Sequence, residues 1–561
     1  MSSLKMISRA KRMKRLLAGV FAATALQAGA FAQSGIEVQS LDALDPMEVG
    51  LPGAAFSMNL WDGSNAQSAA AALGRLPDAG SGSYASQSLS ELARAVLVSG
   101  GYPPAGGRGD ADLALVRTDR LIAAGGVYDA FDLLERTPNL NAVPVLARWH
   151  ADLALTVMEF DRACFMANAL LDGRDEPYWL RVRAFCLALE GQSSAAELTA
   201  ELASGIEADP QFDRMLFAYT LEQGLEGDPV EVRTGLDFAL VRTLTNGDPA
   251  MTIAGEATPR WLADYLDYRR LPNFLNSTDP AGDLQRAGEL TGADREFALI
   301  SVLSQGMDRE IAAQALSELF NDAAEAGDLI TAMRLYGGEV ATLPQTENTL
   351  DDGVRFALAA MLAGDLRTAR AWRNGLIDGP RRAIDPFEVN TVSEADKVEE
   401  ASPTTAAGAE PLVQPVMDTP WQPPAPADMA ALDYALILAS GDLTRPGAEA
   451  VYGAIEERFG TAMLPDLMAL QRLGAPVPQG LRGALLDREP GLVPVEILAM
   501  EEAQVAGAQT EAVLLAAAAL TRADDLNAVD IYPRVATLLG ESDLGGAMME
   551  LLLERHVMRA F

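Results

Sequence analysis

The chain contains very little lysine, histidine or cysteine. Among its 561 residues there are two histidines, His150 and His556, and two cysteines, Cys164 and Cys186. Apart from a basic cluster at the N-terminus, the remaining lysine is Lys397. Phosphate-binding loops and Schiff-base enzymes need a lysine, and a serine–histidine–aspartate triad needs a suitably placed histidine. These absences exclude the common phosphoryl-transfer and lysine-dependent enzymes, and we expect no cofactor.

Neither histidine lies in a motif that would give it a catalytic or metal-binding role. No Gly-x-Ser-x-Gly sequence accompanies either of them, and His150 corresponds to Arg183 in the repeat described below. We therefore expect His150 to be a partly exposed residue on a helix surface. The two histidines and two cysteines lack the clustered spacing of zinc ligands, and no EF-hand sequence indicates calcium. We expect no metal site.

The N-terminus has the features of a secretory signal. Six basic residues precede an uncharged stretch from Leu16 to Ala32, which ends in the small-residue pattern Ala30-Phe31-Ala32. This arrangement is typical of an export signal that is removed from the mature protein. We expect cleavage after Ala32 and a periplasmic or secreted product. The alternative is a retained membrane anchor, the one case in which we expect membrane contact.

Acidic residues greatly outnumber basic ones. The chain has 79 acidic and 43 basic residues, a net charge of −36, and removal of the signal would leave 37 basic residues and a charge of −42. Such a charge disfavours nucleic acid as a partner. It favours a basic protein or peptide partner, although general solubility explains the same excess.

The two cysteines are expected to form a disulfide. They lie 22 residues apart on either side of a turn around residues 172–176, each near the middle of an expected helix. Cysteines of an exported protein usually pair, and antiparallel packing of these helices would bring the two thiols together. A bridge would contribute roughly 3 kcal/mol. The alternative is two buried free thiols.

An internal repeat of 33 residues is the clearest pattern in the chain. Three prolines recur at this interval, each followed four positions later by an arginine, and three alanines keep the same step. Proline at the first turn of a helix loses no hydrogen bond, so each should begin the first helix of a hairpin. Each alanine should lie where the second helix packs closely. The residues are Pro144, Pro177 and Pro210, Arg148, Arg181 and Arg214, and Ala130, Ala163 and Ala196.

Glycine-containing turns separate the helices of each hairpin. In one unit an apolar helical face from Tyr178 to Leu189 is followed by Gly191 and by a second helix that carries Leu198 and Leu202. Glycine ends a helix in the left-handed conformation, and a following aspartate caps the next helix. Gly-Asp pairs of this kind recur at residues 327–328, 364–365 and 441–442.

These hairpins resemble the tetratricopeptide-like repeat family. The family shows Gly-x-(large)-x-x-Ala between helices and units of about 34 residues, and its two small positions match Ala184 with Ala196 and Ala357 with Ala369. The resemblance is best over residues 111–214 and 353–376. It implies an α-solenoid whose concave groove binds peptides or protein segments, and it carries over no catalytic residue.

The order of these patterns predicts an all-α protein in several parts. Seven prolines and several acidic residues indicate a disordered linker over 389–428. Whether the helical blocks on either side stack together stays open. We expect a signal peptide over 1–32, a weakly ordered segment over 33–63, a tetratricopeptide-like repeat domain over 64–388, the linker, and a C-terminal helical domain over 429–561. In that domain the expected helices are Met429–Leu438, Ala448–Phe459, Val495–Val505 and Glu511–Thr521.

Four residues are candidates for partner binding. Arg148, Arg181 and Arg214 would grip carboxylates along the groove as a basic ladder, or would pair with acidic neighbours within the chain. Trp421, which lies between prolines in the expected linker, would anchor another protein or pack onto the helices of its own chain.

Two classes of function are compatible with these features. We expect a non-enzymatic scaffold that holds a protein segment in its groove. The alternative is a cell-envelope peptidoglycan hydrolase or its regulatory subunit, because Glu541-Ser542 and Gly546-Ala547-Met548-Met549 are similar to a lytic transglycosylase pattern. Too little sequence follows Glu541 for a lysozyme-like domain, and we expect no catalytic residue.

Overall fold

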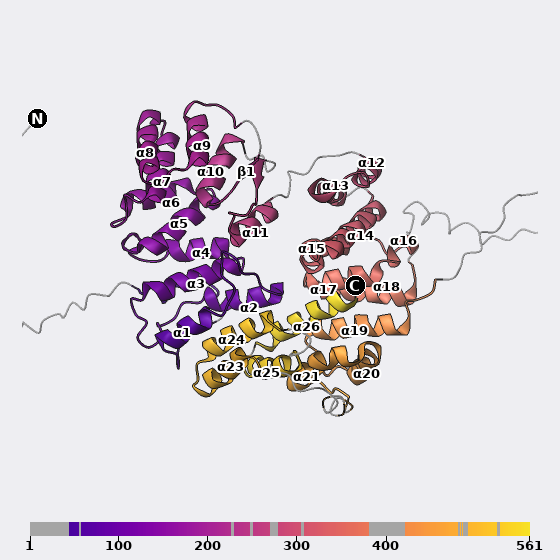
Figure 1. The fold of residues 1–561 in the computed structure, drawn as a ribbon. Helices are drawn as coiled ribbons and strands as arrows, with labels where there is room; N and C mark the ends of the chain where they lie inside the picture. Colours follow the sequence, from indigo (N-terminus) through magenta and orange to yellow (C-terminus); the bar gives the residue numbers. More distant parts are fainter. Residues whose placement is uncertain are drawn as a thin grey trace, which may run out of the picture. The chain divides into compact units, whose positions relative to one another are not determined.

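The computed structural model describes residues 44–560 with several gaps, which are 55, 57, 226–228, 247–250, 270–278, 305–307, 381–420, 479, 481–482, 484, 486–491, 524–527 and 543. The expected signal peptide lies outside this part. The described residues confirm the all-α class: they are mostly helical, with a two-residue parallel pair of strands, β1 (Val230–Glu231) and β2 (Thr252–Ile253) (Figure 1). None of the described helices combines the length and the apolar character needed to cross a membrane.

Successive helix pairs make up the first region of the chain. Pro144, Pro177 and Pro210 begin α5, α7 and α9, as the 33-residue interval predicted. The helices are α1 (Ala66–Leu73), α2 (Gln87–Leu97), α3 (Ala111–Ala123), α4 (Val127–Glu135), α5 (Pro144–Thr156), α6 (Phe160–Ala169), α7 (Pro177–Leu189), α8 (Ser193–Ile206), α9 (Pro210–Thr220), α10 (Gly235–Leu244) and α11 (Arg260–Arg269). We call α3 to α10 the first array.

Small side chains allow the second helix of each pair to approach the first. Ala130, Ala163 and Ala196 lie on α4, α6 and α8, and all three are completely buried. They occupy the positions that the repeat predicted. Leu198 and Leu202 on α8, by contrast, face the solvent.

Residues 45–54 and 58–63, which were expected to be weakly ordered, pack on the rest of the chain, the first stretch through Arg117 of α3 and the second through Thr510. Met47 and Trp61 are buried, and the buried guanidinium of Arg117 donates hydrogen bonds to the carbonyl oxygens of Val49 and Ser99, both at 2.9 Å. Burial lowers the pKa of Arg117 to about 10. The segment has no helical periodicity in its sequence, and it is held by Arg117 together with main-chain hydrogen bonds from Leu51 to Val98 and from Gly101 to Met47.

Two further helix pairs follow in the second region. Gly327 and Gly364 adopt left-handed conformations between the helices of each pair, and Asp365 caps α18 by accepting a hydrogen bond from the Thr368 amide at 3.0 Å. The helices are α12 (Pro280–Ala287), α13 (Gly292–Ser304), α14 (Arg309–Ala326), α15 (Leu329–Tyr336), α16 (Glu347–Leu350), α17 (Gly353–Leu362) and α18 (Leu366–Asp378). We call α14 to α18 the second array.

The C-terminal block contains more helices than the sequence predicted. Two of the predicted helices have the bounds expected and two are longer. Helices α21 and α25 were not predicted, partly because Pro533 lies inside α25, where it reads as a helix break. The helices are α19 (Pro426–Ser440), α20 (Ala448–Phe459), α21 (Leu464–Arg472), α23 (Val495–Val505), α24 (Gln509–Thr521), α25 (Ala528–Glu541) and α26 (Gly545–Ala560).

The C-terminal block packs directly on both other regions. Helix α19 contacts α17 and α18, and Arg373 donates to both oxygens of Asp433 at 2.8 and 2.9 Å. Helix α24 packs on α1 and α2, and α26 packs on α2 and α15. The expected linker was too long at its C-terminal end, because α19 already begins at Pro426. Residues 389–420 lie outside the described part. The described helical blocks therefore stack on one another.

A buried ion network fastens three of these helices together. Arg334 on α15 donates to Glu554 on α26 at 2.7 Å, to Ser88 on α2 at 2.9 Å and to Glu91 on α2 at 3.2 Å. The Glu554 side chain is only 2% exposed. Its charge therefore depends on Arg334 for compensation.

Candidate functional site

The predicted disulfide is present. Cys164 on α6 and Cys186 on α7 are bonded, with their α-carbons 5.7 Å apart. Because the bridge joins the second helix of one hairpin to the first helix of the next, it fixes two neighbouring units of the first array.

The three candidate arginines do not form a ladder. The Arg148 guanidinium lies above the Tyr178 ring, 4.7 Å from its centre, and Arg214 is exposed. Arg181 is buried and donates to the carbonyl oxygen of Glu207 at the C-terminal end of α8. Its carboxylate contact, also with Glu207, is 3.8 Å long. The same repeat position thus performs a different task in each unit, and Arg181 is not free to bind a partner.

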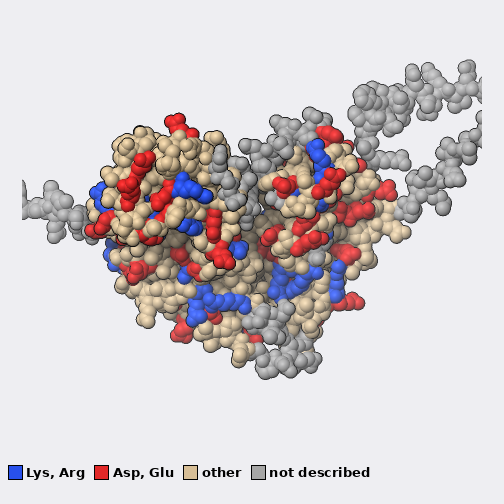
Figure 2. Space-filling model, turned by 45° about the horizontal axis from the view of Figure 1, so that its top comes forward, with Lys and Arg blue, Asp and Glu red and all other residues tan. Residues whose placement is uncertain are grey.

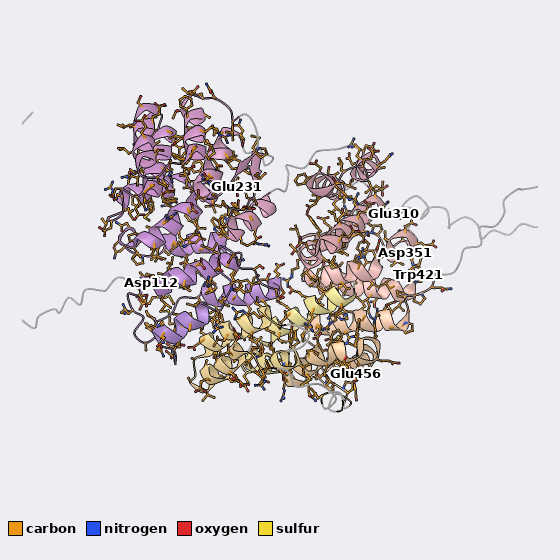
Figure 3. The ribbon with its side chains drawn as sticks, in the orientation of Figure 1. Asp112, Glu231, Glu310, Asp351, Trp421 and Glu456 are labelled. Atoms are coloured by element: carbon orange, nitrogen blue, oxygen red, sulfur yellow. A yellow bond between two sulfur atoms is a disulfide. The ribbon has the colours of Figure 1, made fainter. Side chains whose placement is uncertain are left out.

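Trp421 packs onto its own chain. Its indole nitrogen donates to the carbonyl oxygen of Leu376 at the end of α18, at 3.2 Å, and its ring lies against Gly379 (Figure 3). A side chain held in this way covers the end of α18.

The prediction that His150 is partly exposed is wrong. The residue is 2% exposed, its Nε2 lies 2.5 Å from the Glu135 carboxylate, and its ring stacks on Phe131. Helix α4 packs on this side of α5 and supplies both neighbours. Burial lowers the pKa of His150 despite the carboxylate beside it. Arg183, at the matching repeat position, is only half-buried.

The C-terminal end of α5 in the first array is covered by the chain itself. Helix α10 packs on α5 and α9, and the amide of Gly235 at its start donates to the Asp152 carboxylate on α5 at 3.0 Å. A side chain at position 235 would not fit, because its Cβ would lie 2.1 Å from the Asp152 carbonyl oxygen. The Tyr265 hydroxyl on α11 donates to the Thr156 carbonyl oxygen at 3.3 Å. These contacts leave no room for a partner segment at this end of α5.

The carboxyl group of Asp152 lies under α10 and is largely shielded from water. Burial raises its pKa to about 6, although Arg148, the Gly235 amide and the Tyr178 hydroxyl all favour the charged form. The nearby Asp237 raises it further. The carboxyl has therefore lost much of its hydration to the packing of α10.

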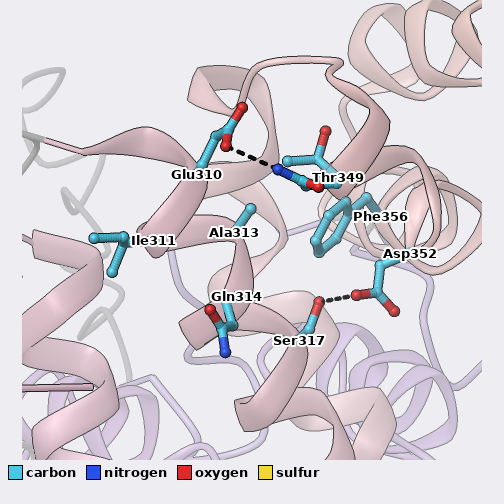
Figure 4. Close-up of a pocket in the computed structure, with 9 residues that line it drawn as sticks. Glu310, Ile311, Ala313, Gln314, Ser317, Thr349, Asp352 and Phe356 are labelled. Atoms are coloured by element: carbon cyan, nitrogen blue, oxygen red, sulfur yellow. Dashed lines mark hydrogen bonds between the residues drawn. The ribbon is translucent and has the colours of Figure 1, made fainter. Parts of the chain in front are cut away.

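In the second array a pocket of about 280 Å³ remains open between the first helices α14 and α17 (Figure 4). On α14 the lining positions share one helical face, and α16 and the start of α17 form the opposite wall. We call this the acidic pocket, and it is lined by Glu310, Ile311, Ala313, Gln314, Ser317, Asn348, Thr349, Asp352 and Phe356.

Two carboxylates set the charge of the acidic pocket. Glu310 accepts a hydrogen bond from the Asn348 amide at 3.2 Å, and Asp352 accepts one from the Ser317 hydroxyl at 2.6 Å (Figure 4). Glu310 and the exposed Asp351 are labelled on these neighbouring elements in Figure 3. No lining residue is basic. The pocket offers carboxylate oxygens at its rim and the partly exposed Ile311 side chain as an apolar surface, which suits the stem and charged head of a lysine or arginine.

A second pocket of about 360 Å³ lies beside α4 and α6 in the first array. Its lining mixes both charges, and Arg162 lies 3.6 Å from Glu135 there. The lining residues are Phe131, Asp132, Glu135, Arg136, Glu159 and Arg162. Because its acids already have basic neighbours, this pocket selects a cation less strongly than the acidic pocket does.

Acid–base chemistry finds little support in either pocket. The described carboxyls whose pKa is raised by burial are Asp119, Asp152 and Glu550, and none of them lines a pocket. Within the described residues, no three histidine, cysteine, aspartate or glutamate side chains are grouped so as to hold a metal ion.

Charge is distributed in small groups over the molecule. Figure 2 shows carboxylates spread over the visible face, with basic side chains in smaller clusters between them. On the face that Figure 2 shows, the acidic side chains are therefore not gathered into one patch.

The comparisons with known proteins give no relative to reason from: no family model, no curated protein and no solved structure matches the chain.

Proposed function

We propose that the protein is an exported, non-enzymatic scaffold of tetratricopeptide-like hairpins that binds a basic protein segment. In this proposal a lysine or arginine of the segment enters the acidic pocket. The observation that carries it is the pair Glu310 and Asp352, two carboxylates on a pocket between neighbouring first helices, with no basic residue in its lining.

The helix pairs support the solenoid part of the proposal. Helices α14 with α15, and α17 with α18, each connect through a left-handed glycine, and α17 also packs against α15. In a solenoid of such hairpins the first helices line one surface. The acidic pocket lies between two first helices, α14 and α17, where that groove is expected.

The energetics suit a modest, specific contact. An exposed ion pair contributes about 0–1 kcal/mol, whereas a hydrogen bond to a charged group in a partly enclosed site contributes about 1.5–3 kcal/mol. Phe356 and Ala313 are buried behind the pocket, and the partly exposed Ile311 gives it an apolar surface for the aliphatic stem. We expect the pocket to select one cationic side chain, with flanking contacts supplying the remaining affinity.

The disulfide and the N-terminal pattern support export. A bonded cysteine pair is typical of oxidising compartments, and the periplasm or the exterior of the cell fits it. Contact with a membrane enters the proposal only if the N-terminal segment is retained, and the net charge of −36 disfavours nucleic acid. No observation favours the alternative of a peptidoglycan hydrolase, since the carboxyls with raised pKa lie outside both pockets.

Equilibrium binding of synthetic peptides tests the proposal. Peptides of one length with zero, two or four arginines, and matched glutamate peptides, would be titrated against the wild type and the E310Q/D352N variant. We expect affinity to rise with arginine count and to fall about ten- to a hundredfold in the variant, equivalent to about 1.4–2.7 kcal/mol. The E325Q/E457Q variant removes the same charge from exposed sites elsewhere and serves as the control.

Three results would contradict the proposal. These are equal binding of arginine and glutamate peptides, equal loss in both variants, and release of fragments from purified peptidoglycan by the protein. Circular dichroism before each titration confirms that the variants are folded.

A further inference from the structure

Helix α8 turns its large apolar side chains to the solvent. Leu198, Leu202 and Ile206 are 59%, 58% and 63% exposed. Their spacing of four residues places them in one stripe about 12 Å long on the same side of the helix. We call these three residues the α8 stripe. The face of α8 that packs on α7 consists instead of small residues, which are Ala196, Ala200 and Ala203.

The fold of α8 does not depend on this stripe. The alanines already provide the close contact with α7, and they lie on the opposite side of the helix. Burying one aliphatic side chain contributes roughly 1.5–3 kcal/mol, so three of them in a row form a surface whose burial by another molecule is favourable. Scattered exposed leucines need no explanation, but a continuous stripe indicates an interaction surface.

The hairpin before it also exposes one large apolar residue at a matching position. Phe165 on α6 stands 33 residues before Leu198, at the matching repeat position, and is 69% exposed. Both α6 and α8 pack on α7. Large apolar residues thus face outward from the second helices of two consecutive units.

An acidic row runs along one flank of the stripe. Glu197 and Glu201 each precede a stripe leucine by one position, and both are exposed. Glu197 accepts a hydrogen bond from the Thr220 hydroxyl on α9 at 3.4 Å, which places this flank on the α9 side. A second copy of the chain would bring a second acidic row against the first, and like charges disfavour such a pairing.

We propose that the α8 stripe docks an amphipathic helix whose apolar side chains repeat every three to four residues and are flanked by lysine or arginine. The apolar residues cover Leu198, Leu202 and Ile206, and the basic residues pair with Glu197 and Glu201. This is a helix-on-helix contact of the kind read at i, i+3, i+4 and i+7. It is separate from the acidic pocket, which lies in the second array.

The test uses a defined probe. An 18-residue helical peptide with a leucine stripe flanked by lysines would be labelled and titrated by fluorescence anisotropy, beside the same peptide with glutamates in place of lysines. The variants are L198Q/L202Q, which removes the stripe, and E197Q/E201Q, which removes the acidic row. The control L498Q/V505Q removes two comparably exposed side chains from α23. These side chains are exposed, so the variants should fold, and circular dichroism checks this.

We expect the basic peptide to lose more than tenfold in affinity for L198Q/L202Q and about fivefold for E197Q/E201Q, the latter only at low salt. The acidic peptide should bind at least tenfold more weakly than the basic one to the wild type. L498Q/V505Q should leave binding unchanged, and the loss in L198Q/L202Q should persist in the E310Q/D352N background, where the acidic pocket no longer competes for the lysines. Unchanged binding in L198Q/L202Q, or an equal loss in the α23 control, overturns the proposal. A concentration-dependent dimer that L198Q/L202Q abolishes also overturns it, since a second copy would then be the occupant.

Discussion

The first helices of the two arrays differ in what covers them. In the first array, α10 lies on α5 and α9, and Gly235 approaches the α5 main chain so closely that only glycine fits. In the second array, α14 and α17 keep an open pocket with two carboxylates. The end of α5 is therefore closed by the chain's own helices, whereas the surface between α14 and α17 stays open. Repeat pattern alone does not locate a binding site.

The strongest test of how the regions of the chain are held together is removal of Arg334. The R334M variant leaves Glu554, which is 2% exposed, without its cation, and removal of one partner of a buried pair costs about 3–5 kcal/mol. Denaturant unfolding measures the loss. The double variant R334M/E554Q should recover much of it, and R458A, which removes an exposed pair with Asp428, should cost less than about 1 kcal/mol. Equal effects of R334M and R458A would show that the network does not hold α15 to α2 and α26.

A methyl group at position 235 should disrupt the packing of α10 on α5. Because its Cβ would lie 2.1 Å from the Asp152 carbonyl oxygen, G235A forces α10 away from α5 at a cost of about 1–3 kcal/mol. Hydrogen exchange should rise in α10 and in the α5 end while α14 and α17 stay protected. G453A, in a helix position with open space around it, should be neutral or stabilising. Unaltered exchange in G235A would mean that the cover is not tight.

The smallest stability effect concerns pH and Asp152. Its pKa is about 6 in the folded chain against an ordinary 3.8, so the folded state binds the proton more tightly than the unfolded state. This group therefore stabilises the fold at low pH. The free energy of unfolding falls as pH rises from about 4 to 6, by an amount on the order of 1–3 kcal/mol. Comparing wild type with D152N at pH 4.5 and 7.5 isolates the effect, and D175N, an exposed aspartate, is the control. A difference of opposite sign would refute the assigned cause.

Much of the first array could be predicted from the sequence because its signals are local. The prolines at a 33-residue interval, the buried alanines and the cysteine pair each report a helix start or a close helix contact. The contacts that a side chain makes at a given repeat position could not be predicted in this way. One repeat position is filled by an arginine in three units. Arg148 stacks on a tyrosine, Arg181 donates to the end of a helix and Arg214 faces the solvent. The role of each depends on its tertiary neighbours.

The candidate site was missed for a related reason. Glu310, Gln314 and Ser317 share a face of α14, a spacing that the sequence contains, but its partner Asp352 lies across a turn whose packing no local pattern gives. His150 was misplaced because burial came from α4, an element outside its own hairpin. Contacts distant along the chain decided both outcomes.

Zero-length cross-linking tests the central claim, that the second array holds the open binding surface, most directly. Outside the N-terminal basic cluster the chain has one lysine, Lys397, so a carbodiimide would join the amines of a bound lysine peptide to the carboxylates it contacts with little internal cross-linking. Mass spectrometry of the digested complex locates the joined residues. We expect most of the cross-links to involve Glu310 and Asp352. The cross-linking yield should fall sharply at high salt. Cross-links concentrated on Asp152 of α5 and Asp237 of α10 would contradict the claim, because the first array would then be the surface that opens to the partner.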